Sequence, residues 1–147
     1  QLAGWVMTAF GVGFIAVRLV LGHLPDRIGG YRVAAYSLLV EELGQMLLWF
    51  APDETLALTG ALITGLGCAL IFPALGVEAL KRVPPASRGS AMGAFVAFLD
   101  IAYGISGPIA GAIASHFSYA AVYLFGAACA LLGALLALTS RAASLHA

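Results

Sequence analysis

The chain has 147 residues, and its seven Lys and Arg residues balance its seven Asp and Glu residues, so that the formal net charge is zero. Charged residues make up 10% of the chain and hydrophobic residues 62%, whereas an ordinary soluble domain has about 25% charged residues. A soluble fold of this size buries too little surface to hide that apolar fraction, and a neutral chain has no basic field to attract phosphates. The composition excludes a soluble domain, a disordered tail and a nucleic-acid binder, and it indicates a polytopic membrane protein in contact with the lipid bilayer.

Five apolar stretches are long enough to cross a bilayer core, which takes about 20 helical residues. They are predicted over residues 3–24, 33–51, 56–78, 91–115 and 119–140. The stretches are continuous and rich in Leu and Ala rather than alternating, which favours helices over strands. We therefore predict an all-α fold, with residues 1–147 forming a single transmembrane domain of five helices.

The basic residues predict the orientation of this bundle. Six of the seven fall in the first link, the third link and the tail: Arg27, Arg32, Lys81, Arg82, Arg88 and Arg141. By the positive-inside rule the C-terminus and the links 25–32 and 79–90 are cytoplasmic, in a multi-pass protein of the plasma (cell inner) membrane. The chain begins with Gln1 and its number of spans is odd, so we expect it to be a segment of a longer protein.

Small residues and one proline predict how the helices pack. Small residues recur along one face of the first span (Gly4, Thr8, Gly11) and along one face of the fourth span, and such faces mark close helix–helix contacts in lipid. Phe72-Pro73 predicts a kink in the third span, because proline frees a backbone carbonyl.

The first link has the composition of a tight reversal between two helices. It reads Gly22-His23-Leu24-Pro25-Asp26-Arg27-Ile28-Gly29-Gly30-Tyr31-Arg32. Gly29 and Gly30 are expected to supply the permissive dihedrals of a turn, and Pro25 to end the first span or fix the entry to the turn. Arg27 and Arg32 can pair with carboxylates or lipid phosphates.

This link resembles the G-x-L-x-D-R-x-G-R-R signature of the major facilitator superfamily. Gly22, Leu24, Asp26, Arg27 and Gly29 match the signature, whereas Gly30 and Tyr31 replace its two basic residues and Arg32 follows directly. The resemblance implies a twelve-helix transporter of two halves, in which these residues form a conformational gate. The signature of this chain has the looser form, and four spans follow it. The resemblance therefore implies that the five spans are helices 8 to 12, in the C-terminal half of the transporter, and that the N-terminal half is missing. In overall texture the chain is similar to bacterial sugar and drug efflux permeases.

The fourth span resembles the G-P-x-x-G-G patch of antiporters of the same superfamily. The matching stretch includes Gly107, Pro108 and Gly111, and Gly104 lies on the same helix face. The resemblance implies close helix packing at these positions, and antiport of a small solute against protons. The residues after Glu78 also resemble the family's link between helices 10 and 11.

Ionisable residues inside spans are costly and therefore point to function. Asp100 lies mid-span on the glycine face of the fourth span, and Glu41 shares a helix face with Ser37 and Gln45. Both are candidates for proton coupling or for contact with a cationic substrate, and the alternative is a hydrogen-bonded packing role. Glu42 has no assigned role.

Glu78 ends the third span beside basic residues and is a candidate for a cytoplasmic ion-pair cluster with Arg88 and Arg18. Such a cluster would hold one transport state. The alternatives are topology control by the basic loops and, for Arg18, snorkelling to the headgroups.

Enzymatic motifs are absent from the sequence. His23, His116 and His146 are far apart, and there is no HExxH or GxSxG. Cys68 and Cys129 lie in apolar runs without metal-ligand spacing and are expected to be small packing residues. We therefore expect no enzyme, no metal and no cofactor. A secondary transporter of a small solute is the leading hypothesis, and a non-transporting structural or assembly subunit is the alternative.

Overall fold

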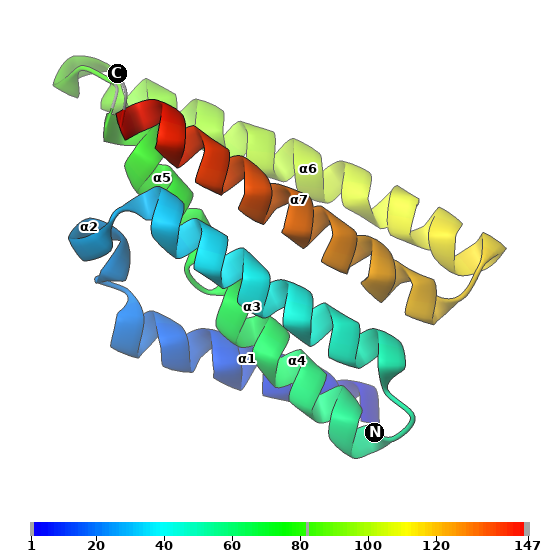
Figure 1. Cartoon of the computed structure of the whole chain (residues 1–147). Coiled ribbons are helices and arrows are strands. Elements are labelled where there is room, and N and C mark those ends of the chain that lie inside the picture. The colour runs from blue at the N-terminus through cyan, green and yellow to red at the C-terminus, as the bar shows by residue number, and fades with distance from the viewer. Residues whose placement is uncertain (1, 82, 146–147) are drawn as a thin grey trace.

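The computed structural model describes residues 2–81 and 83–145, and all regular structure in this part of the chain is helical (Figure 1). The elements in order are α1 (Leu2–Leu21), α2 (Leu24–Ile28), α3 (Gly30–Phe50), α4 (Glu54–Cys68), α5 (Ile71–Lys81), the 3-10 turn η1 (Pro85–Ser87), α6 (Arg88–His116) and α7 (Tyr119–Leu145). In the described part, five helical stretches are long and apolar enough to cross a membrane, with α4 and α5 together making the third. The predicted all-α, five-span fold is confirmed.

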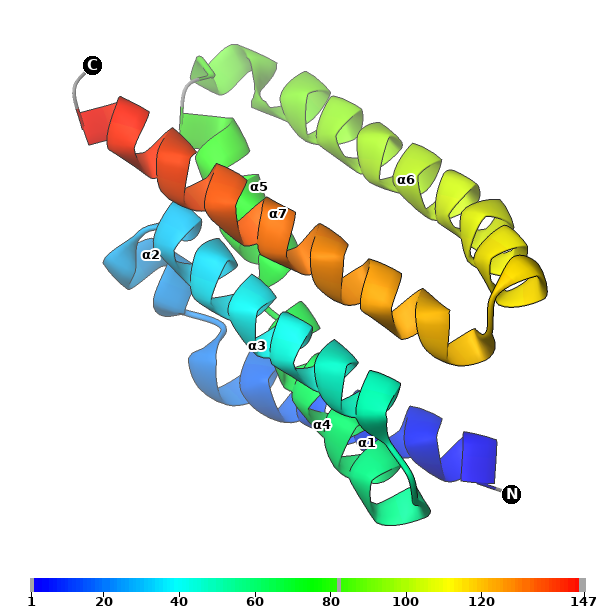
Figure 2. The same cartoon turned by 45° about the vertical axis from the view of Figure 1, so that its right-hand side comes forward.

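Successive spans run in opposite directions, so the connections gather at two ends of the bundle. Figures 1 and 2 show α2, η1 and the C-terminal end of α7 at one end, which we call the link end. The start of α1 and the α3–α4 and α6–α7 turns lie at the other end. The basic links of the sequence therefore share one end of the fold.

The two turns opposite the link end are fixed by side-chain caps. Asp53 is the N-cap of α4, and its carboxylate accepts a hydrogen bond of 2.8 Å from the Leu56 amide. The Ser118 hydroxyl accepts one of 3.1 Å from the Ala121 amide at the start of α7. Both caps satisfy N–H groups that a helix leaves without a partner in its first turn.

α3 is the central helix, with its most extensive contacts to α7 and α4, and α1 packs on α4. Glycines of α4 allow close approach on both sides. A Cβ at Gly65 would fall on the Phe10 carbonyl oxygen of α1, and one at Gly60 would lie 3.1 Å from the Gly44 carbonyl oxygen of α3. In lipid, such close backbone contacts replace the hydrophobic effect as the source of packing energy.

The contact face of α1 is not the one that the small residues predicted. α1 meets α4 through Phe10 and Gly13, whereas Gly4 and Gly11 have open space around them. Phe10 is two residues, or roughly 200° around a helix, from Thr8 on the predicted face. The small-residue face of α1 therefore has no partner within the part of the chain that the structure describes.

The third span is broken where the sequence predicts a kink. α4 ends at Cys68 and α5 begins at Ile71, and Pro73 lies four residues after Ala69. Proline lacks the N–H that would bond to the Ala69 carbonyl, and its ring crowds that carbonyl. Helical hydrogen bonding resumes at the next residue, since the Ala74 amide donates to the Leu70 carbonyl over 2.9 Å.

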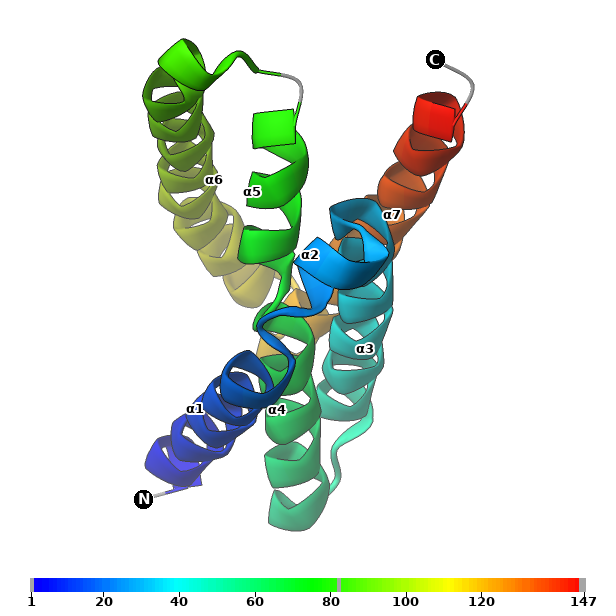
Figure 3. The same cartoon turned by 90° about the vertical axis from the view of Figure 1, so that its left-hand side faces the viewer.

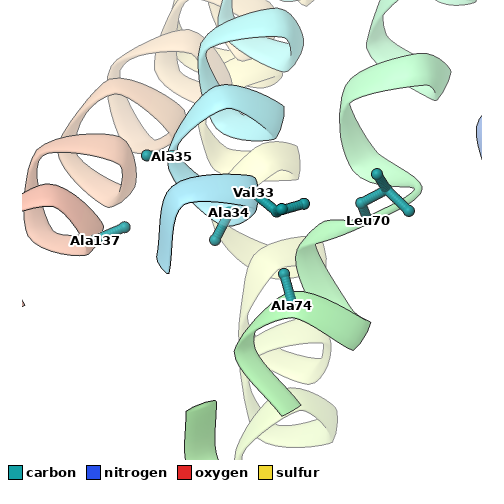
Figure 4. Packing of buried hydrophobic residues seen from close by; sticks show 6 residues of the cluster. All are labelled: Val33, Ala34, Ala35, Leu70, Ala74 and Ala137. Atoms are coloured by element: carbon teal, nitrogen blue, oxygen red, sulfur yellow. The ribbon is translucent and has the colours of Figure 1, made fainter. Parts of the chain in front are cut away.

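A small core lies between this break and α3. The buried residues are Val33, Ala34, Ala35, Leu70, Ala74 and Ala137. Figure 4 shows them coming from α3, from α7 and from the segment around the break, with Val33 reaching toward Leu70. Four of the six are alanines, so the helices approach closely beside the link end.

α6 stands apart from the other helices. It has limited contacts with α7 and α5, and none of its residues is buried. Figure 3 shows it leaving the bundle beside α5. The contact to α5 is aromatic, with the ring centroids of Phe72 and Phe95 5.3 Å apart.

Candidate functional site

The signature link folds as a short helix rather than as an open loop. α1 ends at Leu21, and α2 carries Pro25 in its first turn, where the missing N–H costs nothing. Pro25 is buried, and its carbonyl accepts the Gly29 amide over 3.2 Å. Gly29 has a φ of 95°, a conformation that L side chains rarely adopt, so the predicted glycine turn is confirmed at this position.

Gly30 serves a different purpose from the one that the sequence predicts. It is the first residue of α3, and its φ is not positive. Its amide donates a hydrogen bond of 2.7 Å to Oε1 of Glu78, at the end of the third span. A Cβ on Gly30 would fall on the Ala74 carbonyl oxygen and within 2.9 Å of the Glu78 carboxylate. Only glycine therefore lets α3 start directly against α5.

The Glu78 carboxylate joins the start of α3 to the end of α5 at the link end. Besides Gly30, it pairs with the Lys81 ammonium at 2.6 Å, one turn further along α5. The Glu78 side chain is 12% exposed and that of Lys81 51%. A carboxylate at a helix N-terminus satisfies an unpaired N–H and faces the positive end of the helix dipole. We call this arrangement of Gly30, Ala74, Glu78 and Lys81 the clasp.

The partners of Glu78 differ from those that the sequence predicts. In the part of the chain that the structure describes, neither Arg18 nor Arg88 reaches this carboxylate. The Arg18 guanidinium lies 5.9 Å from the ring centroid of Phe14, one turn back on α1, and Arg88 is exposed at the start of α6. Lys81 is favoured because it lies three residues from Glu78 on the same helix. Arg82, which the sequence places in the same link, lies outside the described residues.

The charged residues of the signature are exposed and are not members of the clasp. Asp26 and Arg27 of α2 and Arg32 of α3 are all exposed. Leu24 packs against the small core, and Gly22 follows α1, where a Cβ would meet the Arg18 carbonyl oxygen. The link is therefore held from inside by apolar contacts and the clasp, and it presents its charges outward.

A second polar feature surrounds Glu41 in the middle of α3. The backbone of Glu41 lies against Gly67 of α4, where a Cβ would fall on the Glu41 amide nitrogen. The Cys68 thiol of α4 interacts with the Glu41 carboxyl. The carboxyl is half-buried between two spans.

Glu41 also lines a cavity of about 470 Å³ between α3, α6 and α7. Gln45 lies on the same wall, as the shared helix face predicts, and Ser106 of α6 and Tyr123 of α7 are its other polar residues. The remaining lining is apolar: Leu38, Ala110, Val122, Phe125, Gly126, Cys129 and Ala130. Apolar walls with a few polar groups are typical of small-molecule sites.

The other residues singled out on the fourth span lie outside this cavity. Asp100 is exposed on α6, and a Cβ added at Gly104, Gly107 or Gly111 would meet nothing within 4 Å. α6 passes through Pro108 without a break. Within the described residues these positions meet no neighbouring helix, so their roles in coupling and packing stay predictions.

Three participants in these contacts are not predicted from the sequence. The sequence predicts a turn role for Gly30, a topology signal at Lys81 and a packing role for Cys68. No local pattern marks the Gly30–Glu78 contact, because 48 residues separate the two. For Lys81 a signal exists, since Glu and Lys three residues apart on a helix often pair.

Together, the fold and the site define a polytopic helical membrane protein with a signature link clasped to its third span and a polar cavity between its helices. The family model of the Major Facilitator Superfamily matches residues 1–146. The chain therefore belongs to the major facilitator superfamily, a family of membrane transporters.

Curated relatives are similar over most of this chain. An uncharacterized MFS-type transporter of Salmonella typhimurium strain LT2 is 55% identical over 131 residues, which are 89% of this chain and 34% of the relative. One of Pseudomonas aeruginosa strain UCBPP-PA14 is 44% identical over 140 residues, 92% of this chain and 35% of the relative. One of Burkholderia mallei strain SAVP1 is 50% identical over 127 residues, 86% of this chain and 31% of the relative. The chain thus spans about a third of the length of the curated relatives it matches.

Proposed function

We propose that this chain is the C-terminal part, helices 8 to 12, of a secondary active transporter that exports a small solute in exchange for protons by alternating access. Membership of the family and the chain's share of its relatives' length support this proposal. The missing N-terminal half would complete the transport pathway, and the link end would face the cytoplasm.

The clasp is the observation that carries the proposal. It ties the start of α3 to the end of α5 through Gly30 and Glu78, so that α5 and the signature link move together. Asp26, Arg27 and Arg32 belong to this link and are exposed. In the proposed mechanism these charges meet the other half when the link end closes, and separate from it when that end opens.

Proton coupling is assigned to Glu41, with Asp100 as the second candidate. Glu41 is an ionisable group inside a span, beside a cavity that can admit a solute. A carboxyl in this position can exchange a proton for a solute contact, which is the requirement for antiport. Asp100 is exposed in this chain and would act only where the other half covers α6.

The test uses the full-length parent protein in proteoliposomes loaded with pyranine, a fluorescent pH indicator. With an imposed pH gradient, sugars, amines and carboxylates are added one at a time. We expect one class to cause proton movement in the wild type, and none to do so with residues 1–147 alone. Proton-linked flux through the segment alone would contradict the assignment to a half transporter.

One variant separates transport from the alternative of a structural or assembly subunit. Asp26→Ala removes an exposed charge of the link without touching the clasp, so its fold should be intact. We expect the solute-dependent flux of the parent to fall at least tenfold. Unchanged flux would contradict the gate role of the link and favour the alternative of a structural or assembly subunit.

A further inference from the structure

The cavity between α3, α6 and α7 has walls of unequal chemistry. Glu41 and Gln45 form a polar strip on α3, while Phe125 and Gly126 of α7 contribute apolar surface opposite. The amide of Gln45 lies 3.2 Å from where a Cβ of Gly126 would be, so glycine makes room for it. Among the described residues, none of those that line the cavity is Lys, Arg or His.

The Glu41 carboxyl has a weak neighbour rather than a counter-ion. The Cys68 thiol interacts with it and carries no charge to balance it, being at most a poor hydrogen-bond donor. An ionised carboxylate between membrane helices is costly unless a positive charge accompanies it. The walls supply no such charge, so either a proton or a bound cation must provide it.

Anionic and polyhydroxylated solutes fit this cavity poorly. Glu41 repels an anion, and a sugar would bring more hydroxyl groups than the four polar side chains can satisfy. Ser106 is already occupied, since its hydroxyl donates to the Tyr103 carbonyl over 2.9 Å. The cost of unpaired buried hydroxyls therefore works against a sugar.

The geometry points to a binding site for a small organic cation, an ammonium group on an apolar or aromatic body, held with its charge at Glu41. This inference rests on the proposed function, because it names the solute class that would exchange with the proton. The volume of about 470 Å³ lies in the range of small-molecule sites, roughly 300–1,000 Å³. Phe125 and Tyr123 offer aromatic surface for the body of the ligand or for its charge.

The test measures binding of three indole compounds of similar size to the full-length parent protein in nanodiscs: tryptamine, which is cationic, tryptophol, which is neutral, and indole-3-propionate, which is anionic. We expect tryptamine to bind at least tenfold more tightly than tryptophol, and indole-3-propionate not to bind. Glu41→Gln should abolish the preference for tryptamine. Glu42→Gln, which changes the neighbouring residue outside the cavity, should retain it.

A second pair of variants tests the location of the proposed binding site without removing a charge. Ala110→Leu places a larger side chain in the cavity from the loosely packed α6, and it should weaken tryptamine binding at least tenfold. Ala112→Leu, on an exposed position of the same helix, should leave binding unchanged. This pair keeps the test decisive if Glu41→Gln does not fold.

Two outcomes would overturn the inference: equal binding of tryptamine and tryptophol by the wild type, or tryptamine binding that neither Glu41→Gln nor Ala110→Leu alters. A parent that transports another solute and does not bind tryptamine would also overturn it, while the proposed function stands. Glu41-dependent tryptamine binding by a parent that moves no solute would support the inference and contradict transport.

Discussion

The Gly30 amide and the Glu78 carboxylate are joined by a hydrogen bond of 2.7 Å, although 48 residues separate them in sequence. This bond gives the first N–H of α3 a partner and holds the end of α5 beside the signature link. The Ala74 carbonyl closes the contact from the other side, since it leaves no space for a Cβ on Gly30. The first link and α5 are therefore joined directly in this structure.

Gly30→Ala should destabilise the parent protein and reduce its transport. The added methyl group would meet the Ala74 carbonyl oxygen, and relieving that overlap costs about 1–3 kcal/mol. We expect the melting temperature in mild detergent to fall by several degrees. Gly89→Ala is the matched control, because its Cβ would lie in open space on α6 and should leave the melting temperature unchanged or slightly raised. Equal melting temperatures for both variants would contradict the close contact.

Glu78 and Lys81 should differ in their importance. Glu78→Ala removes the acceptor of the Gly30 amide, and losing a hydrogen bond to a charged group costs about 1.5–3 kcal/mol. Lys81→Met removes only a half-exposed ion pair, worth about 1 kcal/mol or less. Chemical denaturation of the parent in detergent should therefore rank Glu78→Ala well below Lys81→Met in stability. The reverse order would show that the ion pair, not the bond to the α3 amide, holds the clasp.

Pro73→Ala should stiffen the third span. Alanine restores the N–H that can bond to the Ala69 carbonyl, so α4 and α5 can join into one helix. We expect a higher melting temperature together with slower solute-dependent flux, because α5 then moves less independently of α4. Pro85→Ala in the exposed turn η1 serves as the control and should change neither quantity. Faster or unchanged flux in Pro73→Ala would contradict a hinge at this break.

The orientation of the bundle can be tested by labelling intact cells. In a parent protein with Cys68 and Cys129 replaced by alanine, a single cysteine is placed at Ser87 or at Ser118, both of which are exposed. A membrane-impermeant maleimide should label Ser118→Cys in intact cells, and Ser87→Cys only after permeabilisation. Labelling of Ser87→Cys from outside would invert the proposed topology.

Features that depend on local chemistry could be predicted from the sequence. The five spans follow from runs of apolar residues, which lipid requires whatever the helices pack against. Gly29 could be recognised as a turn residue because its backbone needs no Cβ, and its φ of 95° bears this out. The shared wall of Glu41 and Gln45 follows from their spacing of four residues on one helix.

Features that depend on which helices meet could not be predicted in the same way. Small residues mark a face that can pack closely, yet they do not say whether a partner is present. Glycines that make close contacts lie on α4 and also on α1 and α3, at Gly13 and Gly44, whereas Gly4 of α1 and Gly104 of α6 have open surroundings. The contact of Glu78 with Gly30 could not be predicted for the same reason, since the approach of α3 to α5 is set by tertiary packing around Ala74.

The length of α6 has a consequence for the membrane itself. Its 29 residues make a rod of about 43 Å at 1.5 Å per residue, which exceeds a hydrocarbon core of about 30 Å. An upright rod of this length places its polar ends, Arg88 and His116, in the headgroup regions, and the apolar stretch between them adjusts to the thickness of the core by tilting. The tilt of α6 therefore depends on the acyl-chain length of the host bilayer, and α6 contacts the rest of the bundle at α7 and at the Phe72 and Phe95 rings.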